Sequence, residues 1–330
     1  MNSRPAAKDE LLIVGTGAMA SLFASRLAAH GVQVVMLGTW KEGLDVLNRE
    51  GVTLIGADGD ERAYPVRAVA RAEECKGARQ ALVLVKSWQT PRAARQLKAC
   101  LAPEGIALSL QNGLGNRETL THCLGAGRVA LGVATLGATL LGPGRVRPGG
   151  DGVIAIEKRK RLEPLAALLA GADFRVERHP DPSSLLWGKL VINAAINPLT
   201  ALFSLPNGEL VRRLPERALM AAAAHEAAAV ARAMGVRLPY SDPVAAVETV
   251  ARSTASNRSS MLQDVQRGAP TEIDAISGAI VRAGEHHGVP TPVSRTLWEL
   301  VKARSASEET QAWTPGARQL WDLVQTYPMA

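Results

Sequence analysis

The chain has 330 residues, which is long enough for two domains, and its hydrophobic share of 47% can fill a sizeable core in each. Aromatic residues make up only 4%, so aliphatic side chains must supply most of that packing. The formal net charge is +7, but acids are interspersed among the basic residues, and the tight basic cluster from Lys158 to Arg161 has no aromatic residues around it. We interpret that cluster as a solvated connection between a strand and a helix. The composition therefore argues against a nucleic-acid-binding protein.

The cysteines and the start of the chain indicate the compartment. Cys75, Cys100 and Cys123 are widely spaced and match no metal-ligand or redox motif, so we expect buried free thiols and no metal site. The segment Met1–Glu10 is polar and lacks the apolar core of a signal peptide. No uninterrupted apolar run approaches the roughly 20 residues that cross a bilayer. We therefore expect a cytoplasmic protein that binds neither a membrane nor nucleic acid.

The first half of the chain alternates short apolar runs with helical patterns. Leu11–Gly15 is predicted to be a buried strand, followed by a helix to about His30. Further strands are predicted at Gln33–Leu37, Ala81–Val85 and Ile106–Leu110. Continuous apolar strands separated by helices are typical of a parallel sheet covered on both faces. The fold class is therefore α/β, with a doubly wound Rossmann domain at the N-terminus.

The pattern changes toward the C-terminus. Arg128–Ala134 and Asp151–Glu157 are predicted to be antiparallel additions at the edge of the sheet, because Gly- and Pro-rich turns separate them. Beyond about Asp181 the patterns are mainly helical. We expect a Rossmann domain over residues 1–181 and an all-helical substrate-binding domain over 182–330. The active site is expected in the cleft between them, since ligand sites favour such interfaces.

A glycine-rich segment, Gly15-Thr16-Gly17-Ala18-Met19-Ala20, lies between the first predicted strand and the first helix. Gly15 permits a tight turn, and Gly17 lets backbone N–H groups approach a pyrophosphate at the helix N-terminus. Ala20 stands where the strict motif has a third glycine. Because the strand, the helix and the second strand are all correctly placed, the segment predicts a dinucleotide-binding site.

The end of the second predicted strand bears on the choice between NAD and NADP. An NAD enzyme places an acid there to bind the ribose hydroxyls, but here Gly38 is followed by Thr39 and the first acid is Glu42. Thr39 can donate a hydrogen bond to a 2′-phosphate, and Lys41 can supply positive charge. Alternatively, Lys41 is only the solvated start of the next helix. The segment favours NADPH and leaves NADH open.

Three polar residues recur at helical spacing in an otherwise apolar segment. Lys189, Asn193 and Asn197 stand at i, i+4 and i+8, which places them on one face of a helix. A polar stripe on such a helix is costly unless it faces a solvated cleft or a partner. The stripe is therefore a candidate catalytic group, although an exposed helix face gives the same pattern.

Other polar residues stand at positions typical of ligand sites. Glu272 follows a Pro-Thr pair where we expect a later helix to begin, and Ser260 lies shortly before it. On position alone, Glu272 is also an ordinary acidic helix start. Lys86 and Asn112 come at or near the carboxyl ends of predicted parallel strands, where doubly wound sheets bind ligands. Equally, Lys86 fits a surface lysine and Asn112 fits a turn.

Several long segments resemble the ketopantoate reductase (2-dehydropantoate 2-reductase) family, in the family's order along the chain. They are GTGAMASLFASRL, LVLVKSWQT, QNGLGN, LWGKLVINAAINPLTALFSLPNGEL and SSMLQDVQRGAPTEIDAISGAIVRAGEHHGVPTP. The resemblance implies a Rossmann domain followed by a helical domain, as in 6-phosphogluconate dehydrogenase-like proteins. It also implies NADPH-dependent reduction of ketopantoate to (R)-pantoate in pantothenate and coenzyme A biosynthesis.

The resemblance also implies roles for individual residues. Lys189 matches the family's catalytic lysine, a general acid. The substrate-binding positions are Asn112, Asn193, Asn197, Ser260 and Glu272. The cofactor-binding positions are Gly15, Thr16, Gly17, Ala18, Met19, Ala20, Thr39, Lys41, Lys86, Asn112 and Glu272. The departure from the family is Gly38, where many members have an arginine for the 2′-phosphate.

Residue types fit this chemistry, but other hypotheses share them. Hydride addition to a 2-keto acid builds negative charge on the carbonyl oxygen, and a protonated lysine can neutralise it. Enclosure is expected to lower the pKa of Lys189 from its ordinary value. A related reductase of another 2-keto acid has the same pattern. A non-catalytic dinucleotide-binding protein is disfavoured because Lys189 and Glu272 are both present. A homodimer is also possible, but nothing in the sequence specifies an interface.

Overall fold

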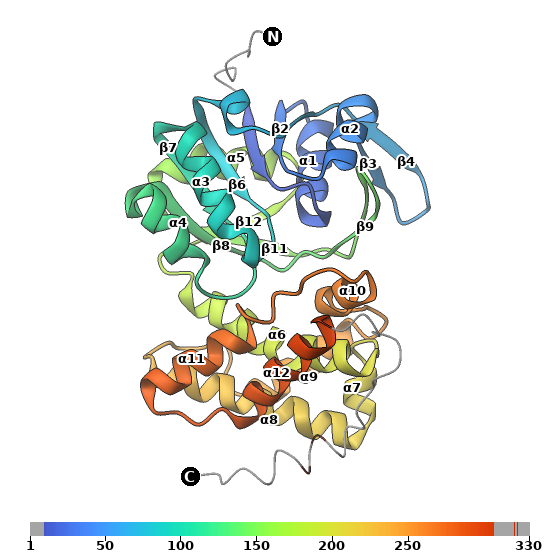
Figure 1. Cartoon of the computed structure of the whole chain (residues 1–330), viewed down its shortest axis with the longest axis vertical. Coiled ribbons are helices and arrows are strands. Elements are labelled where there is room, and N and C mark those ends of the chain that lie inside the picture. Colours follow the sequence, from blue (N-terminus) through green and yellow to red (C-terminus); the bar gives the residue numbers. More distant parts are fainter. Residues whose placement is uncertain (1–9, 307–319, 321, 323–330) are drawn as a thin grey trace. The chain divides into compact units, whose positions relative to one another are not determined.

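The computed structural model describes residues 10–306 together with Leu320 and Asp322, so the predicted polar start lies outside the described residues except for Glu10. Contacts divide the chain into two compact units (Figure 1). The first unit comprises Met1–Gln111 and Gly115–Pro182. The second comprises Ser183–Ala330 and the short segment Asn112–Leu114. Each unit is described by itself below.

The first unit is built on an eight-stranded sheet with the order β12-β11-β8-β7-β6-β1-β2-β5. Its strands are β1 (Leu11–Val14), β2 (Val34–Leu37), β5 (Arg67–Val69), β6 (Ala78–Val83), β7 (Leu101–Ser109), β8 (Val129–Ala134), β11 (Val153–Glu157) and β12 (Arg175–His179). All neighbouring pairs are parallel except β11 with β8. The predicted doubly wound α/β domain is confirmed.

Two features of this unit differ from the prediction. Segment β8 runs parallel to β7, so only its pairing with β11 is antiparallel, and the edge strand is β12. A second sheet, with the order β4-β3-β10-β9, was not predicted. It consists of β3 (Val52–Ile55), β4 (Glu61–Tyr64), β9 (Ala138–Gly142) and β10 (Arg145–Pro148), and the Gly-Pro-Gly turn lies between the last two. Strands β4 and β10 carry charged residues and lack the continuous apolar runs that identify buried strands. Strands β3 and β9 are mostly apolar but only four and five residues long.

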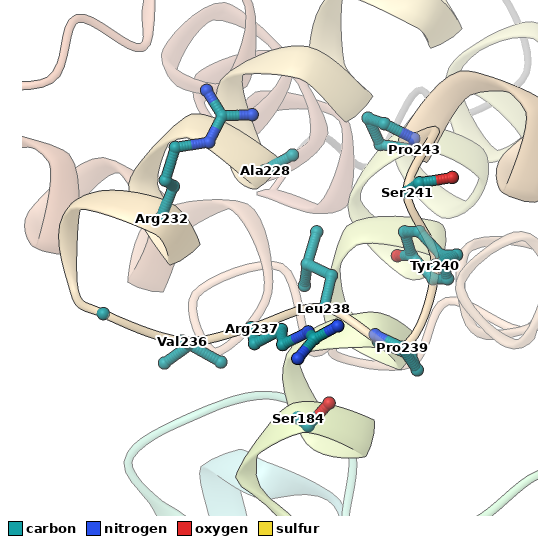
Figure 2. A pocket seen from close by; sticks show the side chains of 11 residues that line it. Ser184, Ala228, Arg232, Val236, Arg237, Leu238, Pro239, Tyr240, Ser241 and Pro243 are labelled. Carbon is teal, nitrogen blue, oxygen red and sulfur yellow. The ribbon is translucent and has the colours of Figure 1, made fainter.

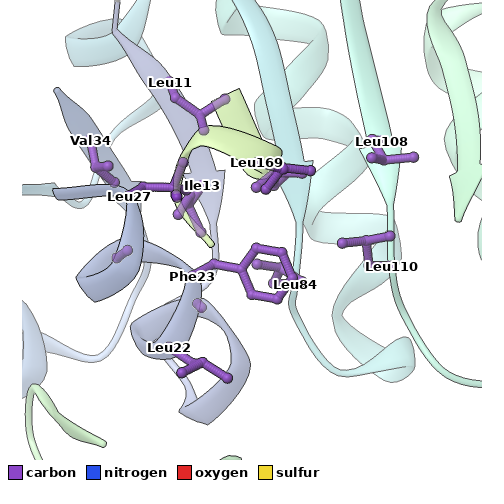
Figure 3. Close-up of a cluster of buried hydrophobic side chains, with 14 of the residues drawn as sticks. Leu11, Ile13, Leu22, Phe23, Leu27, Val34, Leu84, Leu108, Leu110 and Leu169 are labelled. Carbon is purple, nitrogen blue, oxygen red and sulfur yellow. The ribbon is translucent and has the colours of Figure 1, made fainter. Parts of the chain in front are cut away.

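Five helices accompany the sheets: α1 (Ala18–Ala29), α2 (Lys41–Glu50), α3 (Thr90–Cys100), α4 (Asn116–Leu124) and α5 (Glu163–Gly171). Side chains in β1 alternate between two cores, because successive residues of a strand point to opposite faces. Ile13 packs with Phe23 of α1 and Leu169 of α5, as Figure 3 shows. Val14 belongs to the core that contains Leu97 of α3. The carboxyl end of β1 is therefore held rigidly from both faces.

The second unit is helical, with α6 (Ser183–Phe203), α7 (Glu209–Arg212), α8 (Leu214–Ala233), α9 (Pro243–Ser253), α10 (Ser260–Gln266), α11 (Ser277–His287) and α12 (Pro292–Ala306). Helix α6 packs against α8, α9, α10 and α12. Among the described helices it is the one long and apolar enough to span a bilayer, but 72% of that apolar window is buried within the protein. This burial identifies α6 as the core helix of the unit.

Glu272 does not begin a helix, which corrects the prediction. Helix α10 ends at Gln266 and α11 begins only at Ser277. Between them, Gly268 takes a left-handed conformation with φ +63°, and the Glu272 carbonyl accepts hydrogen bonds from the N–H groups of Ala275 and Ile276. Glu272 therefore lies in a turn between the two helices and not on a helix face.

Candidate active site

The glycine loop after β1 combines a tight turn with a close approach to a neighbouring strand end. Gly15 has φ +132°, and its N–H donates to the carbonyl of Leu37 at 2.8 Å. A Cβ on Gly15 would lie 3.2 Å from the backbone carbonyl atoms of Leu84. Both the backbone angle and the lack of space therefore require glycine at this position.

Gly17, by contrast, is not required by the protein's own packing. It is the N-cap of α1 with φ −84°, and a Cβ there would meet no atom within 4 Å. No side chain caps the helix, and its first turn has no acidic residue. The free N–H groups and the open space suit an anion such as the pyrophosphate of a dinucleotide. The loop Gly15–Ala20 therefore fits that cofactor.

The end of β2 lies beside this loop. The N–H of Gly38 donates to the carbonyl of Val69 at 3.0 Å, and Gly38 is buried. Thr39 and Lys41 are exposed, and Lys41 is the first residue of α2. Their positions suit contact with the adenosine ribose, and they equally suit a solvated helix start.

Lys86 is half-buried in the loop that follows β6. It does not follow the strand directly, because the strand ends at Val83, two residues earlier than predicted. Its backbone N–H donates to the side-chain oxygen of Gln89 at 3.2 Å. This bond closes a short turn over Ser87–Gln89 and fixes the backbone from which the lysine side chain extends.

A buried hydrogen-bond network, which the sequence analysis missed, joins the loops after β6 and β7. The side-chain NH₂ of Gln111 donates to the carbonyl of Val85 at 3.0 Å and to the hydroxyl of Thr90 at 2.8 Å. That hydroxyl donates to Asn116, and the Ser109 hydroxyl donates to the carbonyl oxygen of the Gln111 side chain. The only signal in the sequence was the position of Gln111 after a strand. Satisfied buried networks of this kind hold their loops in one arrangement.

In the second unit, the structure brings Asn112 and Glu272 together although 160 residues separate them in the chain. The Asn112 amide donates to Glu272 Oε2 at 3.1 Å, and Glu272 is only 4% exposed. Gly113, with φ +80°, passes so close to Ala275 that a Cβ would lie 2.5 Å from its carbonyl oxygen. The N–H of Leu114 donates to the same carbonyl at 2.9 Å. This docking holds the buried carboxylate in place.

Lys189 on α6 is a half-buried residue whose titration is strongly changed by its surroundings. Desolvation by burial lowers the pKa of the Lys189 amine from 10.5 to about 8, and the negative charge of Glu272 opposes this shift. The amine is therefore a stronger acid than an ordinary lysine, while Glu272 helps to keep it protonated. A residue with such a perturbed pKa is a candidate for proton transfer.

The remaining predicted residues lie on the neighbouring surfaces of α6 and α10. Asn193 and Asn197 follow Lys189 at one and two helical turns, half-buried and 6% exposed respectively. Ser260, the first residue of α10, is exposed. Its neighbour Ser259 is structural, because its hydroxyl caps α10 and accepts a hydrogen bond from Thr200 of α6 at 2.7 Å.

A cavity of about 740 Å³ lies on another side of α6 and contains none of the predicted site residues (Figure 2). Its wall includes Tyr240, whose hydroxyl donates to the carbonyl of Gly188 at 2.8 Å, and burial raises the pKa of this phenol to about 12. Pro239 packs closely on Gly188, and a Cβ on Gly188 would lie 2.7 Å from the Pro239 ring. These contacts support the helical turn that carries Lys189.

One unit is a parallel sheet with a glycine loop, and the other is helical and carries a lysine with a lowered pKa and a buried glutamate. These features are typical of an oxidoreductase that uses a nicotinamide dinucleotide. The family profile described as "Ketopantoate reductase PanE/ApbA" matches residues 11–161, and that described as "Ketopantoate reductase PanE/ApbA C terminal" matches residues 183–305. The chain belongs to the ketopantoate reductase family.

Individual relatives align with this chain over nearly their whole length. The 2-dehydropantoate 2-reductase of Archaeoglobus fulgidus is 36% identical over 296 residues, covering 88% of this chain and 96% of that protein. That of Vibrio cholerae is 33% identical over 308 residues, covering 90% and 98%. The crystal structure of a PanE/ApbA family ketopantoate reductase from Ralstonia eutropha superposes with a TM-score of 0.82 at 34% identity, covering 96% of this chain and 99% of that one.

A structure of D-mandelate dehydrogenase with NADH and anilino(oxo)acetate has a TM-score of 0.85 at 24% identity, covering 90% of this chain and 98% of that one. At this identity the likeness concerns the fold alone.

Proposed function

We propose that the protein catalyses NADPH-dependent reduction of 2-dehydropantoate to (R)-pantoate, in pantothenate and coenzyme A biosynthesis in the cytoplasm. The observation that carries the proposal is the buried Lys189 amine, whose pKa is lowered to about 8 beside Glu272 on the helical unit. The relatives are named 2-dehydropantoate 2-reductases, which supports a small 2-keto acid as the substrate.

The proton comes from Lys189. When bound, the reduced nicotinamide supplies a hydride to C2 of the substrate, and the electron pair of the carbonyl bond moves onto oxygen. The Lys189 ammonium donates a hydrogen bond to that oxygen and transfers its proton as the negative charge develops. The neutral amine then takes a proton from solvent. Its pKa of about 8 lies nearer to neutral pH than that of an exposed lysine, which favours proton donation.

Glu272 and the amides bind the rest of the substrate. One Glu272 oxygen accepts from Asn112, and the carboxylate accepts a further hydrogen bond from the substrate hydroxyl. Asn193, Asn197 and Ser260 donate to the substrate carboxylate without adding a second full charge. Asn112 and Glu272 are also proposed to face the nicotinamide end of the cofactor.

At the other end of the cofactor, the loop Gly15–Ala20 holds the pyrophosphate at the N-terminus of α1. Thr39 and Lys41 are proposed to contact the 2′-phosphate, and Lys86, half-buried in the loop after β6, is proposed to face the cofactor. No carboxylate occurs from 38 to 41 to repel that phosphate, which supports NADPH over NADH.

Steady-state kinetics of the whole chain test the proposal. Initial rates are measured with ketopantoate and either NADPH or NADH, and then with NADPH and other branched or hydroxylated 2-keto acids. The expected result is the highest kcat/KM for ketopantoate with NADPH. A higher kcat/KM for another 2-keto acid would identify a related reductase instead, and a higher value with NADH would overturn the cofactor assignment.

A further inference from the structure

Two buried hydroxyl groups join α6 to α10. The hydroxyl of Thr200, on α6, donates to Ser259 Oγ at the start of α10 over 2.7 Å, although 59 residues separate the two in the chain. Both side chains are buried. The Ser259 oxygen also accepts from the N–H of Leu262 at 3.1 Å, and this bond caps α10. A hydroxyl oxygen has two acceptor positions, so each helix occupies one of them.

Thr200 extends the polar stripe of α6 by one further turn. It follows Asn197 by three residues, and residues three apart lie on the same face of a helix. The Thr200 oxygen also lies 2.9 Å from the carbonyl oxygen of Asn197. On α10, Ser260 comes directly after Ser259 and is the first residue of the helix. The hydroxyl pair therefore lies between two of the residues assigned to the substrate carboxylate.

Apolar residues flank both hydroxyls in the sequence and are buried with them. Leu199 and Met261 belong to the same core cluster, and α6 packs against α10. Apolar packing depends mainly on the area buried and has no preferred direction, so it restricts small shifts of one helix against the other only weakly. A hydrogen bond requires a donor–acceptor distance of about 3 Å and a narrow range of angles. The hydroxyl pair therefore fixes the register of α10 on α6.

We propose that Thr200 is a positioning residue of the substrate site. Through Ser259 it holds Ser260 of α10 in place relative to Asn197 of α6, so that both side chains donate to one carboxylate. The inference rests on the proposed function, which assigns the substrate carboxylate to these residues. Thr200 stands about three helical turns, or roughly 16 Å, after Lys189 on α6. Loss of its hydroxyl should therefore weaken substrate binding and leave proton transfer unchanged.

Two substitutions of Thr200 separate the hydroxyl from the shape of the side chain. Thr200→Val removes the hydroxyl and keeps the shape, whereas Thr200→Ser keeps the hydroxyl. Melting temperature and the rates with ketopantoate and NADPH are measured from about pH 6 to pH 10. Thr200→Val is expected to raise KM about tenfold, to change kcat less than about twofold, and to leave unchanged the pH at which kcat/KM falls. Thr200→Ser is expected to keep KM within about twofold of the wild type.

Thr296→Val on α12 is the matched control. The Thr296 hydroxyl donates to the carbonyl of Pro292, four residues earlier, at 3.0 Å. Thr200 makes the comparable contact with the carbonyl of Ile196 at 3.1 Å. The control therefore removes the same kind of bond within a helix of the same unit. It should change neither KM nor kcat.

Ser259→Gly removes the bond between the helices from the other side. Glycine is tolerated at an N-cap, so α10 should lose little stability. This variant is expected to raise KM as much as Thr200→Val does. Adding Thr200→Val to it should raise KM by less than about twofold more, because both substitutions act through one bond. Ser259→Gly also keeps the test decisive if Thr200→Val does not fold.

Three results would overturn the inference. The first is a lower melting temperature in Thr200→Val with an unchanged KM, since the hydroxyl would then serve stability alone. The second is an equal rise of KM in Thr200→Val and Thr200→Ser. The third is an additive effect of Thr200→Val and Ser259→Gly on KM.

Failure of the proposed function gives a different result. If the wild type reduces another 2-keto acid better than ketopantoate, the proposed function is overturned and the same variants are measured with that acid, which also carries a carboxylate. The expected pattern of KM values would then support the inference. A wild type that reduces no 2-keto acid would overturn both.

Discussion

Replacement of Glu272 by glutamine removes the negative charge that acts on the Lys189 amine. Burial lowers the pKa of Lys189 to about 8, and Glu272 opposes that shift. A nearby opposite charge commonly changes a pKa by about 1 unit or more. Glu272→Gln is therefore expected to lower the pKa of Lys189 by about 1 unit further, because only the charged amine loses a favourable interaction.

The change is visible in the pH dependence of the reaction. Reduction requires the protonated amine, so kcat/KM falls as pH rises through the pKa of Lys189. With a pKa of about 8, roughly nine-tenths of the amine is protonated at pH 7, and a drop of one unit leaves about half. The alkaline limb of the profile is therefore expected to move to lower pH by about 1 unit, apart from any loss of substrate affinity.

The assay is kcat/KM for ketopantoate with NADPH between about pH 6 and pH 10. Asp274→Asn is the matched control, since Asp274 is exposed two residues away and contacts Trp298 at 2.7 Å and Lys302 at 3.6 Å. Its alkaline limb should stay in place. A limb that does not move in Glu272→Gln, or moves to higher pH, would refute the coupling of Glu272 to Lys189.

Two further predictions concern the first unit. Gly17→Ala adds a Cβ that meets no protein atom, so the unfolding free energy should stay within about 1 kcal/mol of the wild type. The Kd of the cofactor should rise about tenfold, because the Cβ occupies the space proposed for the pyrophosphate. Gly127→Ala, where a Cβ also meets nothing, is the control and should leave both quantities unchanged. Gln111→Leu leaves the half-buried Val85 carbonyl and the buried Thr90 hydroxyl without their donor, and should cost about 1 to 3 kcal/mol in urea unfolding. Unchanged cofactor affinity in the first variant, or unchanged stability in the last, would contradict these assignments.

Local patterns were enough to predict the first strand, its glycine loop and helix α1. A buried four-residue strand and the spacing of Gly15 and Gly17 lie within about a dozen residues, and both depend on the backbone itself. The polar stripe of α6 was visible for the same reason, because helical periodicity is a local property. In both places the sequence pattern and the final structure depend on the same short-range geometry.

What the sequence did not reveal depends on contacts between distant segments. Strand β10 pairs with β3 across about ninety residues, and β10 alternates arginines with other residues, so it is not apolar enough to be identified alone. The bent segment at Glu272 resembled a helix start, but its position beside Asn112 is fixed by docking of a segment 160 residues earlier.

The central claim is that the Lys189 amine donates the proton in a reductase of ketopantoate. The most direct test is kcat of Lys189→Ala with ketopantoate and NADPH, measured together with the Kd of NADPH. Loss of a general acid is expected to lower kcat by about a hundredfold or more while the Kd of NADPH changes little. Turnover near the wild-type rate in a variant that binds NADPH normally would contradict the claim.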